Sequence, residues 1–256
     1  MSLIAALLGT AVGRSPLGTV AVFAAMLAGQ LSVGWSNDYL DRDRDAETGR
    51  QDKPVAAGLV PATTVRRAAV LALLAAVPLS LLSGLPATVL HLAAIGSAWA
   101  YNVRLKATVA SVLPYVVSFG LLPAFVVAGL PGHPAPPLWM VLAGSLLGAA
   151  AHFANVLPDL ADDVATGVVG LPHRLGPTAS AATAFVLLLL ASAVLTLGPA
   201  GLPAAIRAGA VPFAAAAGLV GLLLGRRTGS RAAFTAVILV AAVDVMLLLL
   251  AARGRR

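Results

Sequence analysis

Acidic side chains gather at two places in a chain that otherwise carries little charge. The stretch GWSNDYLDRDRD, residues 34–45, has four aspartates within eight positions, although charged residues make up only 11% of the chain and hydrophobic ones 59%. Of the ten acids, six lie in 38–52, three lie in 159–163, and Asp244 stands alone in an apolar run. Acids that only made loops soluble would be scattered along the chain. The two clusters therefore indicate a shared chemical task.

The spacing within each cluster favours metal binding. Asp41 and Asp45 are four residues apart, as are Asp159 and Asp163, so on a helix each pair shares one face. Like charges at this spacing repel each other unless a cation lies between them. Carboxylate oxygens suit Mg²⁺, which commonly keeps some waters and takes other ligands from substrate phosphates. Two facing clusters would then hold a diphosphate through bridging Mg²⁺ ions.

Basic residues near the clusters are candidates for holding the remaining phosphate oxygens. These candidates are Lys53, Arg104, Lys106 and Arg174. A simpler interpretation of the first cluster is a solvated acidic loop that Arg42 and Arg44 neutralise locally. A second cluster in the same register makes that interpretation less attractive.

The two acidic clusters are copies of each other. When the chain is shifted by 118 positions, seven identities fall in one register over 22 residues, and all of them are polar or turn-forming. The matched pairs are Asn37 and Asn155, Asp41 and Asp159, Asp45 and Asp163, Thr48 and Thr166, Gly49 and Gly167, Pro54 and Pro172, and Gly58 and Gly176. We therefore expect two related halves, roughly 1–107 and 108–256, with a common site where they meet.

The elements that carry the clusters are predicted to be membrane helices. The mean hydropathy is +0.94, and apolar runs of about 20 residues, each long enough to cross a bilayer, recur along the whole chain. The predicted spans are 2–13 (partial), 17–36, 63–82, 86–103, 108–130, 138–157, 178–197, 203–224 and 232–252. The sequence thus predicts an all-α, polytopic bundle of about eight to nine transmembrane helices, in a single integral-membrane domain over 1–256.

The distribution of basic residues predicts the topology. The net charge is +7, but the basic residues lie in short loops between apolar runs, which favours contact with anionic lipid over nucleic acid. If the loop at 37–62 is cytoplasmic, the loops that face the same way carry 12 of the 17 basic residues. We therefore expect a multi-pass protein of the cell membrane whose acidic loops lie on the cytoplasmic side.

The acidic motifs resemble those of the UbiA-type intramembrane prenyltransferases. The first family motif reads N-D-x-x-D-x-x-x-D and the second reads D-x-x-x-D. In this sequence they are matched by Asn37, Asp38, Asp41, Asp45, Asp159 and Asp163. DKPVAAG supplies the lysine, Lys53, with the proline and glycine that follow the first motif, and AYNVRLK supplies Tyr101 and Lys106 between the two. The resemblance covers nearly the whole chain in order and spacing.

The resemblance implies about nine helices around a cavity that is capped on the cytoplasmic side. It also implies Mg²⁺ dependence, an isoprenyl diphosphate donor and transfer of the prenyl group to an aromatic or other lipophilic acceptor. We assign catalysis to the five motif aspartates and metal binding to these together with Asn37. Diphosphate binding is assigned to Asn37, Lys53, Tyr101, Arg104, Lys106, Asn155 and Arg174.

Several roles and alternatives stay open at this level. Tyr101, Trp99 or Phe153 could offer a π face to an allylic cation, and His152 could face the cavity or be structural. The same motifs would serve a terpene cyclase or a polyprenyl-phosphate phosphosugar transferase. A divalent-cation transporter is a less favoured alternative, because the acids lie at predicted helix ends and beside basic residues. No motif claims Asp244, and chain length, acceptor, oligomeric state and protein partners are not predicted.

Overall fold

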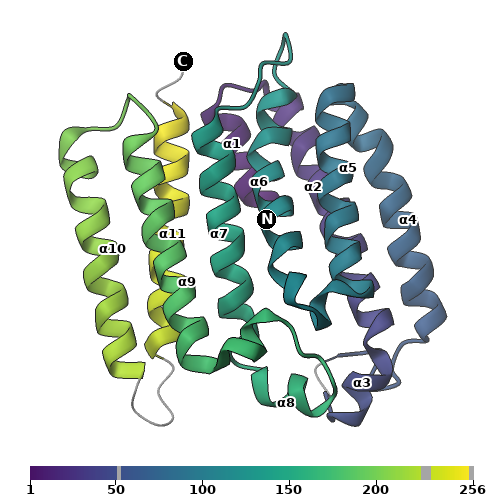
Figure 1. Ribbon diagram of the computed structural model, residues 1–256. Helices are drawn as coiled ribbons and strands as arrows, with labels where there is room; N and C mark the ends of the chain where they lie inside the picture. The colour runs from purple at the N-terminus through teal and green to yellow at the C-terminus, as the bar shows by residue number, and fades with distance from the viewer. Residues whose placement is uncertain (51–52, 226–231, 254–256) are drawn as a thin grey trace.

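The protein is a bundle of roughly parallel and antiparallel helices in a computed structural model, which describes residues 1–50, 53–225 and 232–253. No strand occurs among these residues. The bundle helices are α1 (Ser2–Ala11), α2 (Pro16–Leu40), α4 (Ala62–Leu81), α5 (Leu85–Val103), α6 (Leu113–Ala128), α7 (Leu138–Val156), α9 (Leu171–Leu197), α10 (Ala204–Gly225) and α11 (Ala232–Arg253). Two short helices, α3 (Arg42–Glu47) and α8 (Leu160–Ala165), lie together at one end of the bundle (Figure 1).

The all-helical polytopic fold predicted from the sequence is confirmed. Six segments within the described residues are long and apolar enough to cross a membrane: Pro16–Leu40, Ala62–Leu81, Val109–Ala128, Leu138–Val156, Leu171–Leu197 and Thr235–Arg253. Two further apolar helices, Ser2–Ala11 and Ala204–Val220, are shorter. The count of eight to nine spans therefore stays a prediction.

Three helix boundaries differ from the predicted ones by more than two residues, and one of them is the start of α6, at Leu113 instead of residue 108. The helix predicted at 178–197 is preceded in α9 by a short helical segment that begins at Leu171, and the chain kinks between the two at Gly176, which adopts φ 78°. The helix predicted to end at residue 36 continues to Leu40. Its last turns are held by Asn102 of α5, whose amide donates to the Val33 carbonyl at 2.9 Å and to the Ser36 hydroxyl at 2.8 Å.

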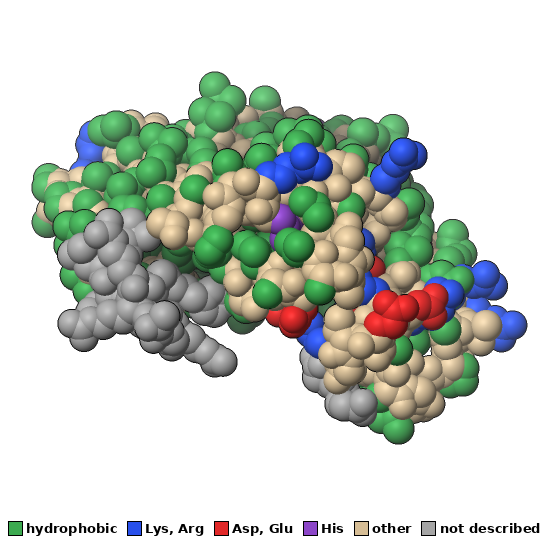
Figure 2. Space-filling model, turned by 60° about the horizontal axis from the view of Figure 1, so that its bottom comes forward, with side chains coloured by type: hydrophobic (Ala, Val, Ile, Leu, Met, Phe, Trp, Pro, Cys, Tyr) green, Lys and Arg blue, Asp and Glu red, His purple; other side chains and the backbone are tan. Residues whose placement is uncertain are grey.

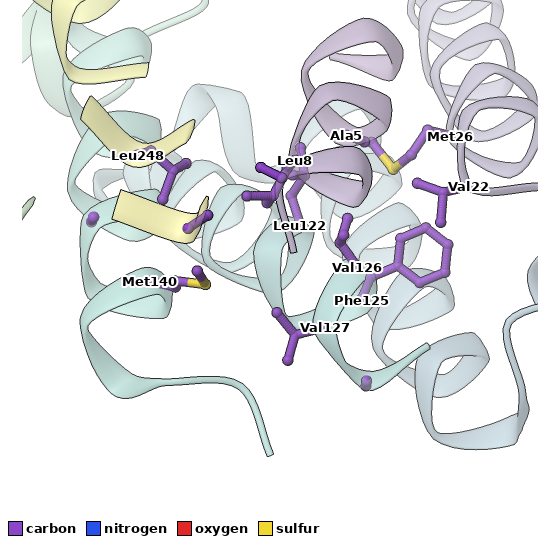
Figure 3. Close-up of a cluster of buried hydrophobic side chains, with 14 of the residues drawn as sticks. Ala5, Leu8, Val22, Met26, Leu122, Phe125, Val126, Val127, Met140 and Leu248 are labelled. Atoms are coloured by element: carbon purple, nitrogen blue, oxygen red, sulfur yellow. The ribbon is translucent and has the colours of Figure 1, made fainter. Parts of the chain in front are cut away.

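A buried apolar cluster joins the first and last helices at the end of the bundle away from α3 and α8. Figure 3 shows side chains of α1, α2, α6, α7 and α11 meeting in it. Its largest buried members include Leu8, Val22, Phe125, Val126 and Met140. In lipid, such packing stabilises helix association through close van der Waals contact.

Helices α6 and α7 approach each other closely because glycines line their contact. A Cβ atom on Gly144 would lie 2.5 Å from the Phe119 carbonyl oxygen, and one on Gly148 would lie 2.4 Å from the Tyr115 carbonyl oxygen. Both neighbours are backbone atoms of α6, so neither can swing aside. The contact fixes α6 against α7, and these two helices carry Tyr115 and Asn155 of the candidate site.

We predict that Gly144→Ala lowers the free energy of unfolding by about 1–3 kcal/mol, since the added methyl overpacks a tight contact. Gly96→Ala is the matched control, because a Cβ atom at Gly96 would have nothing within 4 Å. The measurement is thermal unfolding in detergent followed by tryptophan fluorescence. A melting temperature for Gly144→Ala equal to that of the control would contradict the predicted contact.

Candidate active site

Both acidic loops fold in the same way at the same end of the bundle. The Asp45 N–H donates to the Asp41 carbonyl at 2.8 Å, and the Asp163 N–H donates to the Asp159 carbonyl at 2.9 Å, so each pair lies on one helical turn as predicted. The residues that follow also match in geometry. Gly49 and Gly167 both adopt left-handed φ values, 68° and 80°, which glycine accommodates without strain.

A cavity of about 750 Å³ opens between the two acidic loops and extends into the bundle. Figure 2, in which this end comes forward, shows acidic and basic side chains side by side on a largely apolar molecule. The predicted site residues that line the cavity are Asn37, Asp38, Asp41, Asp45, Lys53, Tyr101, Lys106, Asn155, Asp159 and Asp163. The structure thus brings both clusters to one space.

Arg104 and Arg174, which were assigned to diphosphate binding from the sequence, do not line the cavity. Both side chains are exposed. Arg104 follows the last turn of α5 with an extended φ of −149°, and Arg174 lies in the first turn of α9 beside the buried Pro172. Both arginines lie at the same end of the bundle as the acidic loops, as their positions in the sequence indicated. Other residues near the ends of these helices line the cavity instead.

Arg44 connects the two acidic clusters. Its guanidinium lies 2.9 Å from Asp41 Oδ2 in the first loop and 3.7 Å from Asp163 Oδ1 in the second. Asp41 is 5% exposed, and its second oxygen forms an ion pair with Lys106. Arg44 was considered in the sequence only as a local neutraliser of its neighbours. In the fold it lies between the clusters.

A second set of ion pairs ties the loop at 48–60 to the site. Lys53 Nζ lies 2.8 Å from Asp45 Oδ2 and 3.3 Å from Asp38 Oδ1. Arg50 lies 3.7 Å from Asp159 Oδ2 and so makes a further connection between the two loops. Lys53 and Arg50 thus place positive charge beside the clustered carboxylates, as the repulsion between those carboxylates predicted.

The two lysines at the site differ in basicity. Burial lowers the pKa of Lys53, but its hydrogen bonds and ion pairs with Asp45 and Asp38 together raise the pKa above its usual value. For Lys106, burial is the larger effect, and the pKa lies below its usual value despite the contact with Asp41. Lys53 is therefore the more firmly protonated of the two.

The second acidic loop is positioned by a histidine whose role the sequence did not establish. The Gly170 N–H donates to His173 Nδ1 at 3.0 Å, so a neutral ring carries its proton on Nε2 and donates to Asp163 Oδ2 at 3.2 Å. Gly170 is needed here, because a Cβ atom would lie 2.5 Å from the Lys106 carbonyl oxygen. The contact holds the Lys106 segment against the second loop.

The aromatic wall of the cavity differs from the predicted one. Tyr101 lines the cavity, and so does Tyr115, which the sequence analysis missed. Their rings meet edge to face at 5.3 Å, and Asn155 lines the same cavity. Trp99 and Phe153 do not line the cavity. Trp99 donates instead to the Ser32 hydroxyl at 3.1 Å.

Two buried polar residues do not line the cavity. His152 is 1% exposed and contacts the Ser111 hydroxyl at 2.9 Å, which agrees with the structural alternative for this histidine. Asp244 of α11 is fully buried and accepts a hydrogen bond from Ser192 of α9 at 2.6 Å. It therefore joins two helices remote from the acidic loops.

The oxygen ligands at the cavity mouth fit Mg²⁺ only if a substrate completes the coordination. Among the described residues, no three acidic or histidine side chains converge into a ready-made metal cage. Each acidic region instead presents three carboxylates and one asparagine amide to the same cavity. Mg²⁺ is typically held in this way, by one or two carboxylates with water and substrate phosphates.

Comparisons with known proteins agree with this architecture. A UbiA homolog from Aeropyrum pernix K1 in its apo form has a TM-score of 0.72 at 20% identity, with 96% of this chain and 95% of that chain covered. A UbiA homolog from Archaeoglobus fulgidus, bound to GPP and Mg²⁺, has a TM-score of 0.66 at 18% identity, with 96% and 95% covered. A digeranylgeranylglyceryl phosphate synthase has a TM-score of 0.67 at 15% identity, with 98% and 91% covered.

At these identities the solved structures establish the fold alone. Among curated proteins, none matches the chain. The UbiA prenyltransferase family, however, matches residues 1–242, nearly the whole sequence. The protein therefore belongs to the UbiA prenyltransferase family.

Proposed function

We propose that the protein is a Mg²⁺-dependent intramembrane prenyltransferase, which ionises an isoprenyl diphosphate and transfers the prenyl group to an aromatic or other lipophilic acceptor. The observation that carries the proposal is the position of Arg44, which contacts carboxylates of both acidic loops. A ligand at this point would meet both clusters at once. The GPP and Mg²⁺ bound by the Archaeoglobus fulgidus homolog support the same substrate class.

The reaction begins with cleavage of the bond between the allylic carbon and the diphosphate oxygen, whose electron pair leaves with the diphosphate. Bound Mg²⁺ would neutralise the charge that develops on this leaving group. Asp38, Asp41 and Asp45 with Asn37 would hold the metal from the first loop, and Asp159 and Asp163 would hold it from the second, where Asn155 would contact the diphosphate. Lys53 and Lys106 lie where they can bind the remaining phosphate oxygens.

The allylic cation that results must be kept from water until the acceptor attacks it. Apolar residues of α2, α5 and α6 line the interior of the cavity, and such a pocket suppresses capture by water. Tyr101 and Tyr115 line the same cavity, and aromatic rings can stabilise positive charge. The acceptor then forms a bond to the allylic carbon and loses a proton.

The orientation in the cell membrane follows from charge. The end of the bundle with α3 and α8 also carries Arg42, Arg66, Arg67, Arg104 and Arg174, and an excess of basic residues is typical of the cytoplasmic side. We therefore place the site on the cytoplasmic face. The exposed Arg104 and Arg174 fit a role in topology and lipid contact better than one in substrate binding.

The matched geometry of the two acidic loops supports an origin from two related halves, roughly 1–107 and 108–256. Besides the aspartate pairs, Gly58 and Gly176 also share a left-handed φ, at 72° and 78°. Each half supplies one acidic loop to the common cavity. The single domain of 1–256 would then be a pseudo-repeat whose site lies at the meeting of its halves.

The proposal predicts Mg²⁺-dependent release of diphosphate from an isoprenyl donor. Purified protein in nanodiscs is incubated with prenyl diphosphates of several lengths, with Mg²⁺ or EDTA, first alone and then with membrane extract. We expect diphosphate release with Mg²⁺ only, and an alkylated product only with extract, by mass spectrometry. A cyclic hydrocarbon formed without extract would indicate a terpene cyclase instead. No release of diphosphate, together with Mg²⁺ flux into liposomes, would indicate a transporter.

A further inference from the structure

The inner end of the cavity carries two polar side chains that the acidic site does not use. The cavity runs along one face each of α2, α5 and α6 as far as Met26, His91 and Phe125. Most of the residues there are apolar, but Gln30 and His91 also line it. Polar groups in an apolar membrane cavity are costly unless they meet a partner, so their presence needs an explanation.

The free lone pair of His91 faces this inner end. The Ser80 hydroxyl lies 2.6 Å from the Ala76 carbonyl oxygen, which is an acceptor only, so the Ser80 proton is used in that bond. The contact of 2.7 Å between the Ser80 oxygen and His91 Nδ1 therefore requires a proton on Nδ1. This leaves Nε2 of the neutral ring as a hydrogen-bond acceptor, and no described residue donates to it.

The imidazole is held rigidly in this orientation. It stacks on Phe125 with ring centroids 4.6 Å apart and planes at 15°. On the side of α2, a Cβ atom at Gly29 would lie only 3.0 Å from His91 Nε2, so the glycine lets the ring approach the helix. The side chain is 3% exposed, and its free nitrogen is thus a fixed point on the cavity wall.

Gln30 offers an amide to the same cavity. Its side chain is exposed to the cavity, and within the described part of the chain it has no hydrogen-bond partner. Gln30 lies seven residues before Asn37, two helical turns away on the same face of α2, or about 10 Å along the helix. The helix therefore fixes the distance between Gln30, at the inner end of the cavity, and Asn37, at the acidic mouth.

We propose that Gln30 and His91 form a binding site for a hydroxyl group on an aromatic acceptor, an inference that rests on the proposed prenyl transfer. The hydroxyl donates to His91 Nε2 and accepts from the Gln30 amide. The reacting carbons must approach to about 3–3.5 Å. A para oxygen lies roughly 4 Å from the opposite ring carbon by ordinary bond lengths. A single aromatic ring bound at Gln30 and His91 would therefore span most of the distance to the reacting carbon at the acidic mouth.

A hydrocarbon tail is a poorer occupant of this end of the cavity. It would leave both the Gln30 amide and the His91 lone pair without a partner, and unpaired polar groups in an apolar site disfavour binding. A hydroxyl group satisfies both, since it is a donor and an acceptor at once. Gln30 and His91 thus select for the acceptor.

The test compares two acceptors that share a ring and differ in their hydroxyl groups. Hydroquinone and 1,4-dimethoxybenzene are offered, under anaerobic conditions, to the full-length protein in nanodiscs with Mg²⁺ and geranyl diphosphate. The readout is the ratio of the two kcat/KM values. We expect this ratio to fall about tenfold in Gln30→Leu and in His91→Phe relative to the unmodified protein. Intrinsic ring reactivity cancels, because the same two acceptors are compared in every variant.

Ser118→Ala provides the matched control, because the Ser118 hydroxyl already donates to the Ala94 carbonyl at 2.9 Å. Its ratio should equal that of the unmodified protein. Unchanged ratios in both Gln30→Leu and His91→Phe would overturn the assignment, as would donor consumption without alkylation of either ring. Failure to consume geranyl diphosphate at all would instead contradict the proposed function itself, and the two failures are therefore distinguishable.

Discussion

Asp41→Asn is expected to lower kcat/KM for the isoprenyl diphosphate donor by roughly 10³-fold. Asp41 lies at the centre of the acidic mouth, 5% exposed and in contact with both Arg44 and Lys106. Asparagine keeps the shape of the side chain but removes the charge that would hold Mg²⁺. Its amide would also direct N–H groups toward two cations. The Mg²⁺ concentration for half-maximal activity should rise at the same time.

Asp43→Asn provides the matched control for this prediction. Asp43 lies two residues further along, in α3, but its side chain is 79% exposed and among the described residues it pairs only with Arg42, at 3.0 Å. It does not line the cavity. We expect kcat/KM within about twofold of the unmodified protein, since exposed ion pairs contribute little. Equal losses in the two variants, measured by release of diphosphate, would argue against a specific role for Asp41.

Arg44→Gln is expected to lower kcat/KM for the donor by about 10²-fold, the loss typical of removing one group that stabilises developing negative charge. Arg44 is the cation that lies between the two loops, with Asp41 on one side and Asp163 on the other. Unlike Asp41→Asn, this change should not raise the Mg²⁺ requirement, because removing a competing cation leaves the carboxylates more available to the metal. Titration of activity with Mg²⁺ separates the two behaviours.

Arg42→Gln is the control for the arginine. Arg42 also lies in α3, but its guanidinium lies 4.9 Å from the centre of the Tyr39 ring and contacts Asp43 outside the cavity. Little change in kcat/KM is expected. If Arg42→Gln and Arg44→Gln caused the same loss, the effect would reflect the general charge of the loop, and the bridging position of Arg44 would have no special importance.

The sequence predicted the helices and the paired aspartates well because both depend on local patterns. Apolar runs of membrane length specify helices with little ambiguity, and a four-residue spacing fixes which carboxylates share a face. The register shift of 118 positions further identified the second cluster. The resulting fold places Asp41, Asp45 and Asp163 around a common cavity, as the pattern indicated.

The parts that the sequence could not predict depend on contacts between distant segments. Arg44 was interpreted as neutralising its neighbours, since nothing in its local sequence reveals Asp163 nearby. Tyr115 lies in the first turn of α6 in a run without any motif, and only the packing of α6 on α7 brings it to the cavity that Asn155 also lines. Arg104 and Arg174, by contrast, are near the motifs in sequence but exposed in the fold.

We infer above all that both acidic loops bind the same metal-bound diphosphate. A double-mutant cycle tests this most directly. Calorimetry would measure binding of a non-ionisable geranyl thiodiphosphate with Mg²⁺ to the unmodified protein, Asp41→Asn, Asp163→Asn and the double variant. We predict that each single change weakens binding at least tenfold and that the double variant is weakened far less than the product of the two. Losses that simply multiply, or unchanged binding in either single variant, would contradict a shared ligand.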